Sequence, residues 1–272
     1  MTTPRRTGAV RIADVPPDIL AALNAGELET ATLAECLAID QMQLVRHVFP
    51  TLQLERRIAA LESELQQHSK LTAMRATRII AADLASVVSP DRRPRSTWTR
   101  LRGHPSDTVR GWAAFVIGLQ PDWSLADRLA ALQPLAADPH FGVREAAWLA
   151  VRDSILAEIE YAISRLTPWA GAADPLLRRF ASEATRPRGV WCAHSDRLKA
   201  EPELGLPILE PLKNDDAKYV RDSVGNWLND AAKSRPDWVR EICARWSVES
   251  PTKATAEIAK RAQRSLPTRP VG

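Results

Sequence analysis

The sequence repeats a helical unit of about 35 residues, and this repetition restricts the possible fold more than any other feature. Each copy runs from an acidic or proline-containing corner into an apolar helix with an arginine near its start. The copies are HPSDTVRGWAAFVIG (104–118), DPHFGVREAAWLAVR (138–152), DPLLRRFASEATR (174–186) and NDDAKYVRDSVGNWL (214–228). Their marker arginines, Arg110, Arg144, Arg179 and Arg221, are spaced by 34, 35 and 42 residues. A degenerate fifth copy, 249–266, has Ala256 in place of the arginine and is predicted to cap the stack.

Periods of this length with two helices per unit are typical of HEAT-type solenoids. Apolar residues recur at helical spacing along most of the chain after residue 19, and alternating strand-like runs are hard to find. We therefore predict an all-α fold, a HEAT-like α-solenoid built as a curved stack of antiparallel helix pairs. Its concave face would be a groove lined by one helix from each unit. Arginines in such repeats often brace one unit against the next, so by themselves they identify no ligand.

The pattern also predicts how the chain is organised. We expect a flexible basic leader (1–18), an N-terminal helical part of the solenoid (19–100), HEAT-like repeats with the DNA-binding groove (101–267) and a short tail (268–272). Amphipathic helices are expected over 28–49 and 54–65, and the longest loop over 89–97. The leucine seam in 54–65 is too short for a dimer zipper, and packing within a solenoid explains it better, so we expect a monomer.

Composition excludes several classes of protein. The sequence lacks both the apolar core of a signal peptide and any run of 18 apolar residues, which predicts a cytoplasmic protein that does not span a membrane. Cys36, Cys192 and Cys243 are too few and too far apart for a disulfide framework or a zinc site. Nucleotide-binding loops and the usual hydrolase motifs are absent. We expect neither a metal nor a cofactor.

The net charge of +4 is unevenly distributed. Eight arginines stand against three acids between Arg75 and Arg110 (Arg75, Arg78, Arg92, Arg93, Arg95, Arg100, Arg102 and Arg110 against Asp83, Asp91 and Asp107). Such a patch is suited to a phosphate backbone. A solvated helix face followed by a basic loop explains the same residues.

Two further stretches carry unusual polar residues. In FASEATRPRGVW (180–191), Glu183 comes near the end of a helix that Pro187 interrupts, where a carboxylate opposes the helix dipole. The helix near 219–233 has a buried apolar row and, beside it, a polar row of Tyr219, Ser223, Asn226, Asp230 and Lys233. An ordinary solvent-facing row is the simpler interpretation of the second pattern, but these residues together also fit a helix that lines a groove.

Three segments resemble a known family. SEATRPRGVW (182–191), DDAKYVRDSVGNWLNDAAKSRPDWV (215–239) and ALNAGELETATLAECLAID (22–40) are similar to the AlkC branch of the HEAT-like alkylpurine DNA glycosylases, relatives of the AlkD enzymes. The resemblance implies an enzyme that removes alkylated bases, chiefly cationic 3-methyladenine, from double-stranded DNA by cutting the N-glycosidic bond. Many relatives carry an immunoglobulin-like domain after the solenoid, whereas this sequence stops at Gly272. The DNA contacts of that domain would then be missing, or the basic region 75–110 would replace them.

The resemblance also implies site residues. Glu183, Asp230 and Trp191 match family active-site positions, and Glu145 corresponds most nearly to a third acid, although Ala146 and Ala147 follow it where the family pattern differs. We expect Glu183, Trp191 and Asp230 to converge on one wall of the groove. The DNA-binding candidates are Arg144, Arg186, Arg188, Lys218, Arg221 and Lys233.

The residue types suit this chemistry. A base alkylated at N3 is a cation and departs as a neutral leaving group, so the developing charge lies on the sugar. A carboxylate can stabilise that charge or align the attacking water. Trp191 could stack on the lesion or the sugar, although core packing is the simpler role for a tryptophan. Two alternatives remain open, a non-catalytic HEAT-repeat scaffold and a protein that binds damaged DNA without cutting it.

Overall fold

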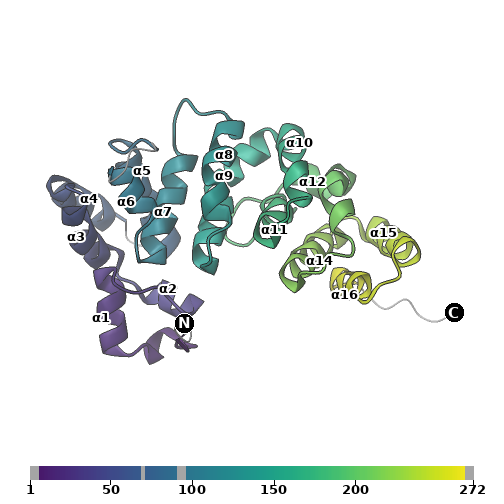
Figure 1. The fold of residues 1–272 in the computed structure, drawn as a ribbon, viewed down its shortest axis with the longest axis horizontal. Helices are drawn as coiled ribbons and strands as arrows, with labels where there is room; N and C mark the ends of the chain where they lie inside the picture. The colour runs from purple at the N-terminus through teal and green to yellow at the C-terminus, as the bar shows by residue number, and fades with distance from the viewer. Residues whose placement is uncertain (1–5, 69–70, 91–95, 267–272) are drawn as a thin grey trace. The chain divides into compact units, whose positions relative to one another are not determined.

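All regular secondary structure in residues 6–68, 71–90 and 96–266, which the computed structural model describes, is helical (Figure 1). The all-α prediction is confirmed. The chain divides into two units, Met1–Ala150 and Val151–Gly272. The division falls inside one helix, α9, and not near residue 100, where the repeat pattern had placed the start of the repeats.

The N-terminal unit is a succession of short helices. Its elements are η1 (Ile12–Asp14), α1 (Pro17–Ala25), α2 (Leu33–Ala38), α3 (Gln41–Thr51), η2 (Glu55–Arg57), α4 (Ile58–Gln66), α5 (Ala73–Ala85), α6 (Thr97–Arg102), α7 (Asp107–Gly118), α8 (Leu125–Ala136) and the first part of α9 (Phe141–Ala157). Neighbouring helices pack in chain order, with α3 against α1 and α4, and α7 against α5, α6 and α8. Trp112 of α7 lies at the centre, edge-on to Phe49 of α3.

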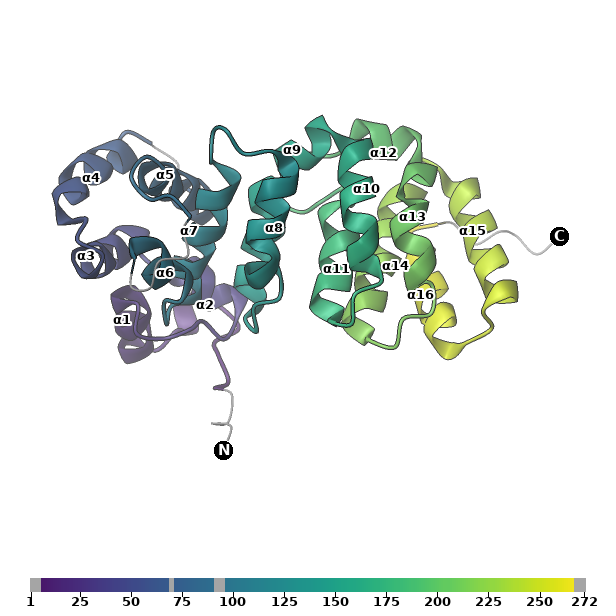
Figure 2. The same cartoon turned by 45° about the horizontal axis from the view of Figure 1, so that its top comes forward.

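The C-terminal unit has the helix pairs that the repeat pattern predicts. After the end of α9 come α10 (Ile159–Ala170), α11 (Pro175–Ala184), α12 (Asp196–Ala200), η3 (Pro202–Gly205), α13 (Leu206–Leu209), η4 (Glu210–Leu212), α14 (Lys218–Ala232), α15 (Pro236–Glu249) and α16 (Lys253–Ala262). Three of these helices, α11, α14 and α16, pack side by side in that order (Figures 1 and 2). Each also contacts its preceding or following partner, α10 or α15.

The repeat arginines occupy one position of the fold. Each is the fourth residue of its helix and donates hydrogen bonds to the carbonyls six and five residues earlier, which form the corner before the helix. The pairs are Arg110 to His104 and Pro105, Arg144 to Asp138 and Pro139, Arg178 to Ala172 and Ala173, and Arg221 to Asp215 and Asp216. The third marker is therefore Arg178. The prediction of Arg179 was wrong by one residue.

Three of these arginines also reach a carboxylate of the following repeat. The ion pairs are Arg110–Asp138 at 2.9 Å, Arg178–Asp215 at 2.6 Å and Arg221–Glu257 at 2.9 Å. In the structure these side chains brace one repeat against the next. Ala256, the fourth residue of α16, stands where the series loses its arginine.

The N-terminal segment differs from the expected leader. Within 1–18, residues 6–18 contain η1 and the start of α1, and Arg6 donates two hydrogen bonds, of 2.6 and 2.7 Å, to the carboxylate of Glu35. Residues 1–5 and the tail 268–272 lie outside the described residues, as do positions 91–95 of the predicted loop and the arginines there.

The helix expected over 28–49 is two helices. The chain breaks at Ile39, and the carboxylate of Asp40 accepts hydrogen bonds from the first backbone N–H groups of α3, as an N-cap does. Among the described residues, no helix combines the length and the apolar character needed to cross a membrane.

Candidate functional site

Helix α11 brings Glu183 into the interior. Asp174 caps its N-terminus and Pro175 occupies its first position, which fixes where the helix begins. The helix stops at Ala184, shortly before Pro187, whose missing N–H and ring prevent its continuation. The last turn therefore holds Glu183 with its side chain only 5% exposed.

Helix α14 supplies the opposing residues. It packs against α11, and of the polar row predicted on it, Ser223 and Asp230 are buried, Tyr219 and Asn226 are half-buried, and Lys233 is exposed. The row is thus not an ordinary solvent-facing one. Ser223 of this row lies against α11, because it hydrogen-bonds to Ser182 and Glu183 of that helix.

Arg186 joins the two acids. Its Nη1 donates to Oε1 of Glu183 at 2.7 Å, and its Nε donates to Oδ2 of Asp230 at 2.9 Å, with Nη2 2.8 Å from the same oxygen. We call Arg179, Glu183, Arg186, Ser223 and Asp230 the Arg186 cluster. The structure thus brings Glu183 and Asp230 together through a shared guanidinium in a buried position, and their convergence with Trp191 on one wall of a groove stays a prediction.

Other members of the cluster hold Glu183 ionised. Ser223 donates to its Oε2 at 2.7 Å, and Arg179 lies 3.5 Å from the same oxygen. Burial by itself would raise the pKa of Glu183, but the charges of Arg179 and Arg186 and the hydrogen bonds from Arg186 and Ser223 outweigh it and lower that pKa. Burial opposes the charge of Arg186 in the same way, and its two carboxylates still raise its pKa. This is a charged cluster at neutral pH.

The Arg186 cluster continues toward solvent through two residues of α14. Lys233, exposed, lies 3.4 Å from Oδ1 of Asp230. The guanidinium of Arg179 stacks over the ring of Tyr219, 4.7 Å from its centre. An aromatic face and two cations thus flank the carboxylates.

The loop between α11 and α12 presents Trp191. Its indole is 59% exposed, and its backbone has φ = +60°, a left-handed conformation that is unfavourable for a residue with a side chain. Core packing, the simpler interpretation of this tryptophan, is wrong. No contact between Trp191 and either carboxylate is recorded, so its convergence with them stays a prediction. Arg188, on the same loop, donates to Oγ of Ser234 at 2.8 Å.

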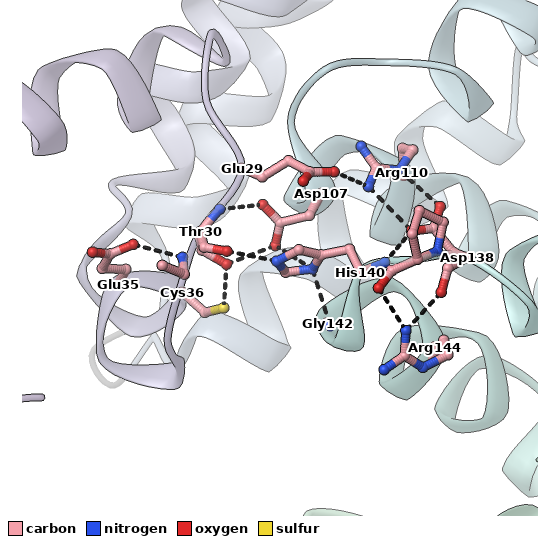
Figure 3. Close-up of polar contacts among 12 residues, drawn as sticks. Glu29, Thr30, Glu35, Cys36, Asp107, Arg110, Asp138, His140, Gly142 and Arg144 are labelled. Atoms are coloured by element: carbon pink, nitrogen blue, oxygen red, sulfur yellow. Dashed lines mark hydrogen bonds and ion pairs between the residues drawn. The ribbon is translucent and has the colours of Figure 1, made fainter. Parts of the chain in front are cut away.

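The N-terminal unit holds Glu145 and a second buried polar cluster. Glu145 accepts a hydrogen bond from Nε1 of Trp148 at 2.8 Å. Nearby in the sequence, His140 donates or accepts at three points: Nε2 lies 2.6 Å from the carbonyl of Thr30, and Nδ1 lies 3.1 Å from the Gly142 N–H and 3.3 Å from Oδ2 of Asp107 (Figure 3). Because the carbonyl of Thr30 can only accept, Nε2 donates to it, while Nδ1 faces both the Gly142 N–H and the carboxylate of Asp107.

Asp107 completes this second cluster. It accepts from the N–H and Oγ1 of Thr30, both at 2.9 Å, and Oγ1 also lies 2.9 Å from the sulfur of Cys36. Desolvation raises the pKa of the Cys36 thiol to about 12, so it is no nucleophile. We call Thr30, Cys36, Asp107 and His140 the His140 cluster. It ties the segment before α2 to the starts of α7 and α9.

The predicted DNA-binding residues divide into two groups. Arg144 and Arg221 support the corners of their own repeats, and Arg186 binds the two acids. Lys218 and Lys233 are exposed, each beside one carboxylate. A phosphate-binding role for these five residues and for Arg188 stays a prediction. Lys218 and Lys233 are the most accessible of the six.

Sequence reasoning missed three participants. Arg179 was assigned to the repeat corner, although its spacing of four residues from Glu183 on a helix was a usable signal. Ser223 was placed in the polar row but given no role. Arg152 was not considered at all. Among the described residues, no group of three His, Cys, Asp or Glu side chains is arranged to hold a metal ion.

Comparisons with known proteins cover the helices that carry this site. Residues 147–261 match the family model of the DNA alkylation repair enzymes. This match contains Glu183, Arg186, Trp191 and Asp230. The chain is also 40% identical over 117 residues to the protein YhaZ of Bacillus subtilis, covering 43% of this chain and 32% of YhaZ.

Solved structures show the same architecture. The Pseudomonas fluorescens alkylpurine DNA glycosylase AlkC, bound to DNA containing an abasic site analog, has a TM-score of 0.63 and 26% identity, over 84% of this chain and 62% of AlkC. AlkD2 from Streptococcus mutans has a TM-score of 0.57 and 23% identity, over 79% of this chain and 99% of AlkD2. The resemblance to the AlkC and AlkD-like proteins and the HEAT-like helical class are thereby confirmed. The chain spans about a third of YhaZ and less than two thirds of AlkC.

Proposed function

We propose that this protein is a monofunctional DNA glycosylase, which hydrolyses the N-glycosidic bond of cationic N3-alkylated bases of the 3-methyladenine type in double-stranded DNA. The observation that carries the proposal is the gathering of two carboxylates, Glu183 and Asp230, around one delocalised cation. Similarity to AlkC, solved on DNA with an abasic site analog, supports it. The family match over the same helices supports it as well.

The chemistry needs negative charge more than it needs a proton donor. An N3-alkylated base leaves as a neutral molecule, and the positive charge passes to the deoxyribose as an oxocarbenium-like ion. An ionised carboxylate beside C1′ stabilises that ion, and a second carboxylate can align the attacking water. Glu183, whose pKa is lowered against the effect of its burial, meets the first requirement at neutral pH. Asp230 is the candidate for the second.

Arg186 must give way for this to happen. In the free protein it neutralises both acids, and neither can act on a sugar while it does so. A DNA phosphate is a bidentate acceptor of the kind that guanidinium groups prefer. We expect Arg186 to exchange one carboxylate for a phosphate when the duplex binds, so that the acids become available only on DNA. The exposed ammonium of Lys233 would extend the same phosphate contacts.

Trp191 suits the remaining task of holding the lesion. Its exposed indole offers an electron-rich face, which attracts a cationic base or sugar. The left-handed backbone at Trp191 is consistent with a residue kept in place for a function rather than for packing.

One observation favours a second function. Both carboxylates are ion-paired and their side chains are only 5% exposed, as in a purely structural cluster. The protein would then be a HEAT-repeat scaffold or a binder of damaged DNA without catalysis.

The release of free base from methylated duplex DNA distinguishes these functions. We expect the wild type to release 3-methyladenine, measured by chromatography, and Glu183→Gln and Asp230→Asn to release it about 10²- to 10³-fold more slowly. Binding to a duplex with an abasic site analog, measured by fluorescence anisotropy, should change little in either variant.

Asp222→Asn is the matched control. Asp222 lies on α14 as well, and it pairs with Arg261 at 2.6 Å, outside the Arg186 cluster. It should excise at the wild-type rate. Full activity in both cluster variants, or no released base from the wild type, would exclude the proposed catalysis and leave the binding function.

A further inference from the structure

The most deeply buried arginine of the C-terminal unit lies outside the ion pairs described above. The side chain of Arg152, on α9, is completely buried. Among the described residues no carboxylate lies within ion-pair distance of its guanidinium, and burial lowers its pKa. A buried charge without a counterion is costly, so a protein retains it where its hydrogen bonds are needed.

Its guanidinium makes four hydrogen bonds to backbone carbonyls of one segment, and it also interacts with the side chain of Cys192 in that segment. Nη1 donates to the carbonyl of Ala184 at 2.7 Å, and Nη2 donates to that of Arg186 at 2.6 Å. Nε and Nη2 both donate to the carbonyl of Ala193, at 3.3 and 3.2 Å. These acceptors are the end of α11 and both sides of the loop that follows it.

That loop carries the functional candidates. Arg186 and Trp191 lie within the segment from Ala184 to Ala193, and Trp191 is in a strained backbone conformation. Two neighbouring contacts close the loop further: Nε1 of Trp227 donates to the carbonyl of Thr185 at 3.0 Å, and the N–H of Ser195 donates to the carbonyl of Pro187 at 2.9 Å. The side chain of Arg152 contacts both ends of the loop, through the carbonyls of Ala184 and Ala193.

Arg152 has a counterpart in the next repeat. Arg152 is eleven residues after the first residue of α9, and Arg186 is eleven residues after the first residue of α11. The two are equivalent in successive repeats. One has its guanidinium on backbone carbonyls, and the other has its guanidinium on Glu183 and Asp230.

We infer that Arg152 is a positioning residue, which holds the 184–193 loop so that Arg186 meets both acids and Trp191 is presented to the substrate. It does not touch substrate itself. This inference rests on the proposed glycosylase function for its effect on rate, but not for its effect on the loop. A displacement of about 1 Å at a reacting group can cost about 10²-fold in rate.

The test compares Arg152→Met with Arg178→Met. Methionine keeps much of the length of the apolar stem and removes the donors in both. Arg178 also donates to two backbone carbonyls, but it pairs with Asp215 and supports a repeat corner. Both variants are expected to lower the melting temperature. Only Arg152→Met should accelerate hydrogen exchange in a peptide spanning 184–195, and it should do so in conditions where α14 remains protected.

Kinetics provide the second measurement. With methylated DNA, Arg152→Met should lower kcat by about 10²-fold with KM changed by less than about threefold, because the acids are misplaced while most DNA contacts remain. Arg178→Met should change kcat by less than about threefold per folded molecule. Arg152→Lys keeps the charge but cannot reach carbonyls on both sides of the loop, so it should resemble Arg152→Met.

Each outcome bears on a different claim. Unchanged exchange over 184–195 in Arg152→Met, or equal losses of kcat in both methionine variants, would overturn the positioning role. If the wild type released no base while Arg152→Met still loosened the loop, the holding of the loop would stand and the glycosylase proposal would fall. If Arg152→Met does not fold, Arg152→Lys provides the same exchange measurement.

Discussion

The two buried polar clusters both contain buried carboxylates, but different kinds of groups hold these carboxylates. In the His140 cluster, the carboxylate of Asp107 and the ring of His140 are satisfied largely by hydrogen-bonding groups of the segment before α2. In the Arg186 cluster, two carboxylates share one guanidinium, and the ammonium group of Lys233 lies beside Asp230. The partners in the first cluster are a backbone N–H, a hydroxyl, a backbone carbonyl and an imidazole. The carboxylates of the second cluster are held by a guanidinium, an ammonium group and a hydroxyl.

The groups that hold the buried carboxylates distinguish the two clusters, whereas the exposed fractions of the carboxylates do not. Asp107 and Asp230 are both about equally inaccessible, 3% and 4% exposed. Hydrogen bonds from a backbone N–H fix Asp107 to the fold, whereas Asp230 is held only by side chains. A carboxylate held by mobile side chains can be released without unfolding.

Of these two buried carboxylates, Asp107 is expected to have the larger effect on stability when it is replaced by alanine. Removing this carboxylate leaves the N–H and hydroxyl of Thr30 buried without an acceptor, and the free energy of unfolding should fall by about 3 kcal/mol. Asp230→Ala should cost about half as much, because Arg186 keeps Glu183 as a partner. Urea titration followed by circular dichroism measures both. Equal losses would contradict the distinction between the clusters.

A smaller effect is expected from Trp191→Ala. Because the indole is mostly exposed and lies outside the core, the free energy of unfolding should change by less than about 0.5 kcal/mol. Excision of 3-methyladenine should slow by about tenfold, which is ~1.4 kcal/mol of lost transition-state stabilisation. Trp148→Ala, which removes a buried tryptophan outside the Arg186 cluster, is the opposite control and should destabilise the fold strongly. If Trp191→Ala lowered the free energy of unfolding and left excision unchanged, Trp191 would be a packing residue and not one that acts on the substrate.

The smallest effect concerns acid stability in the N-terminal unit. The ion pair with Arg6 and the backbone N–H groups of Ala31 and Ala9 lower the pKa of Glu35 to about 2, although burial opposes the shift. A carboxyl whose pKa is lower in the folded protein stabilises the fold above its ordinary pKa, and this contribution is lost as pH falls toward 2. Glu35→Gln should therefore flatten the pH dependence of unfolding between about pH 5 and 2.

The exposed Glu64 provides the comparison for this measurement. Glu64→Gln should leave the slope of the unfolding free energy against pH unchanged. If both variants retain the wild-type slope, the Arg6 pair does not contribute to acid stability.

The sequence predicts the helices better than the contacts between them. Period and corner residues were enough for the repeats, because each unit is defined by local spacing. The register of the marker arginine failed at 178–179, where two arginines are adjacent and only the three-dimensional corner distinguishes them. The break at Asp40 was missed because a capping aspartate inside an apolar run looks like one exposed position of a longer helix.

The site was only partly predictable, for a physical reason. Ser223 and Asp230 lie in one row by helical geometry, so their common face follows from spacing. The bridge from Arg186 to Asp230 joins residues 44 positions apart and depends on how α11 packs on α14. Arg152 could not be found by composition, since buried arginines are rare and a charged residue is first assigned to the surface.

The ion pairs of the corner arginines bear on the order in which the repeats are joined while the chain is synthesised. Arg178 and Arg221 each pair with a carboxylate in the repeat that follows, whereas Arg110 pairs both with Asp138 of the following repeat and with Glu29 earlier in the chain. On the ribosome, Arg178 and Arg221 therefore meet these carboxylates only after the next corner has left the exit tunnel. These repeats would therefore be joined one after another during synthesis. A pause in translation between two corners would leave the last arginine without its ion pair.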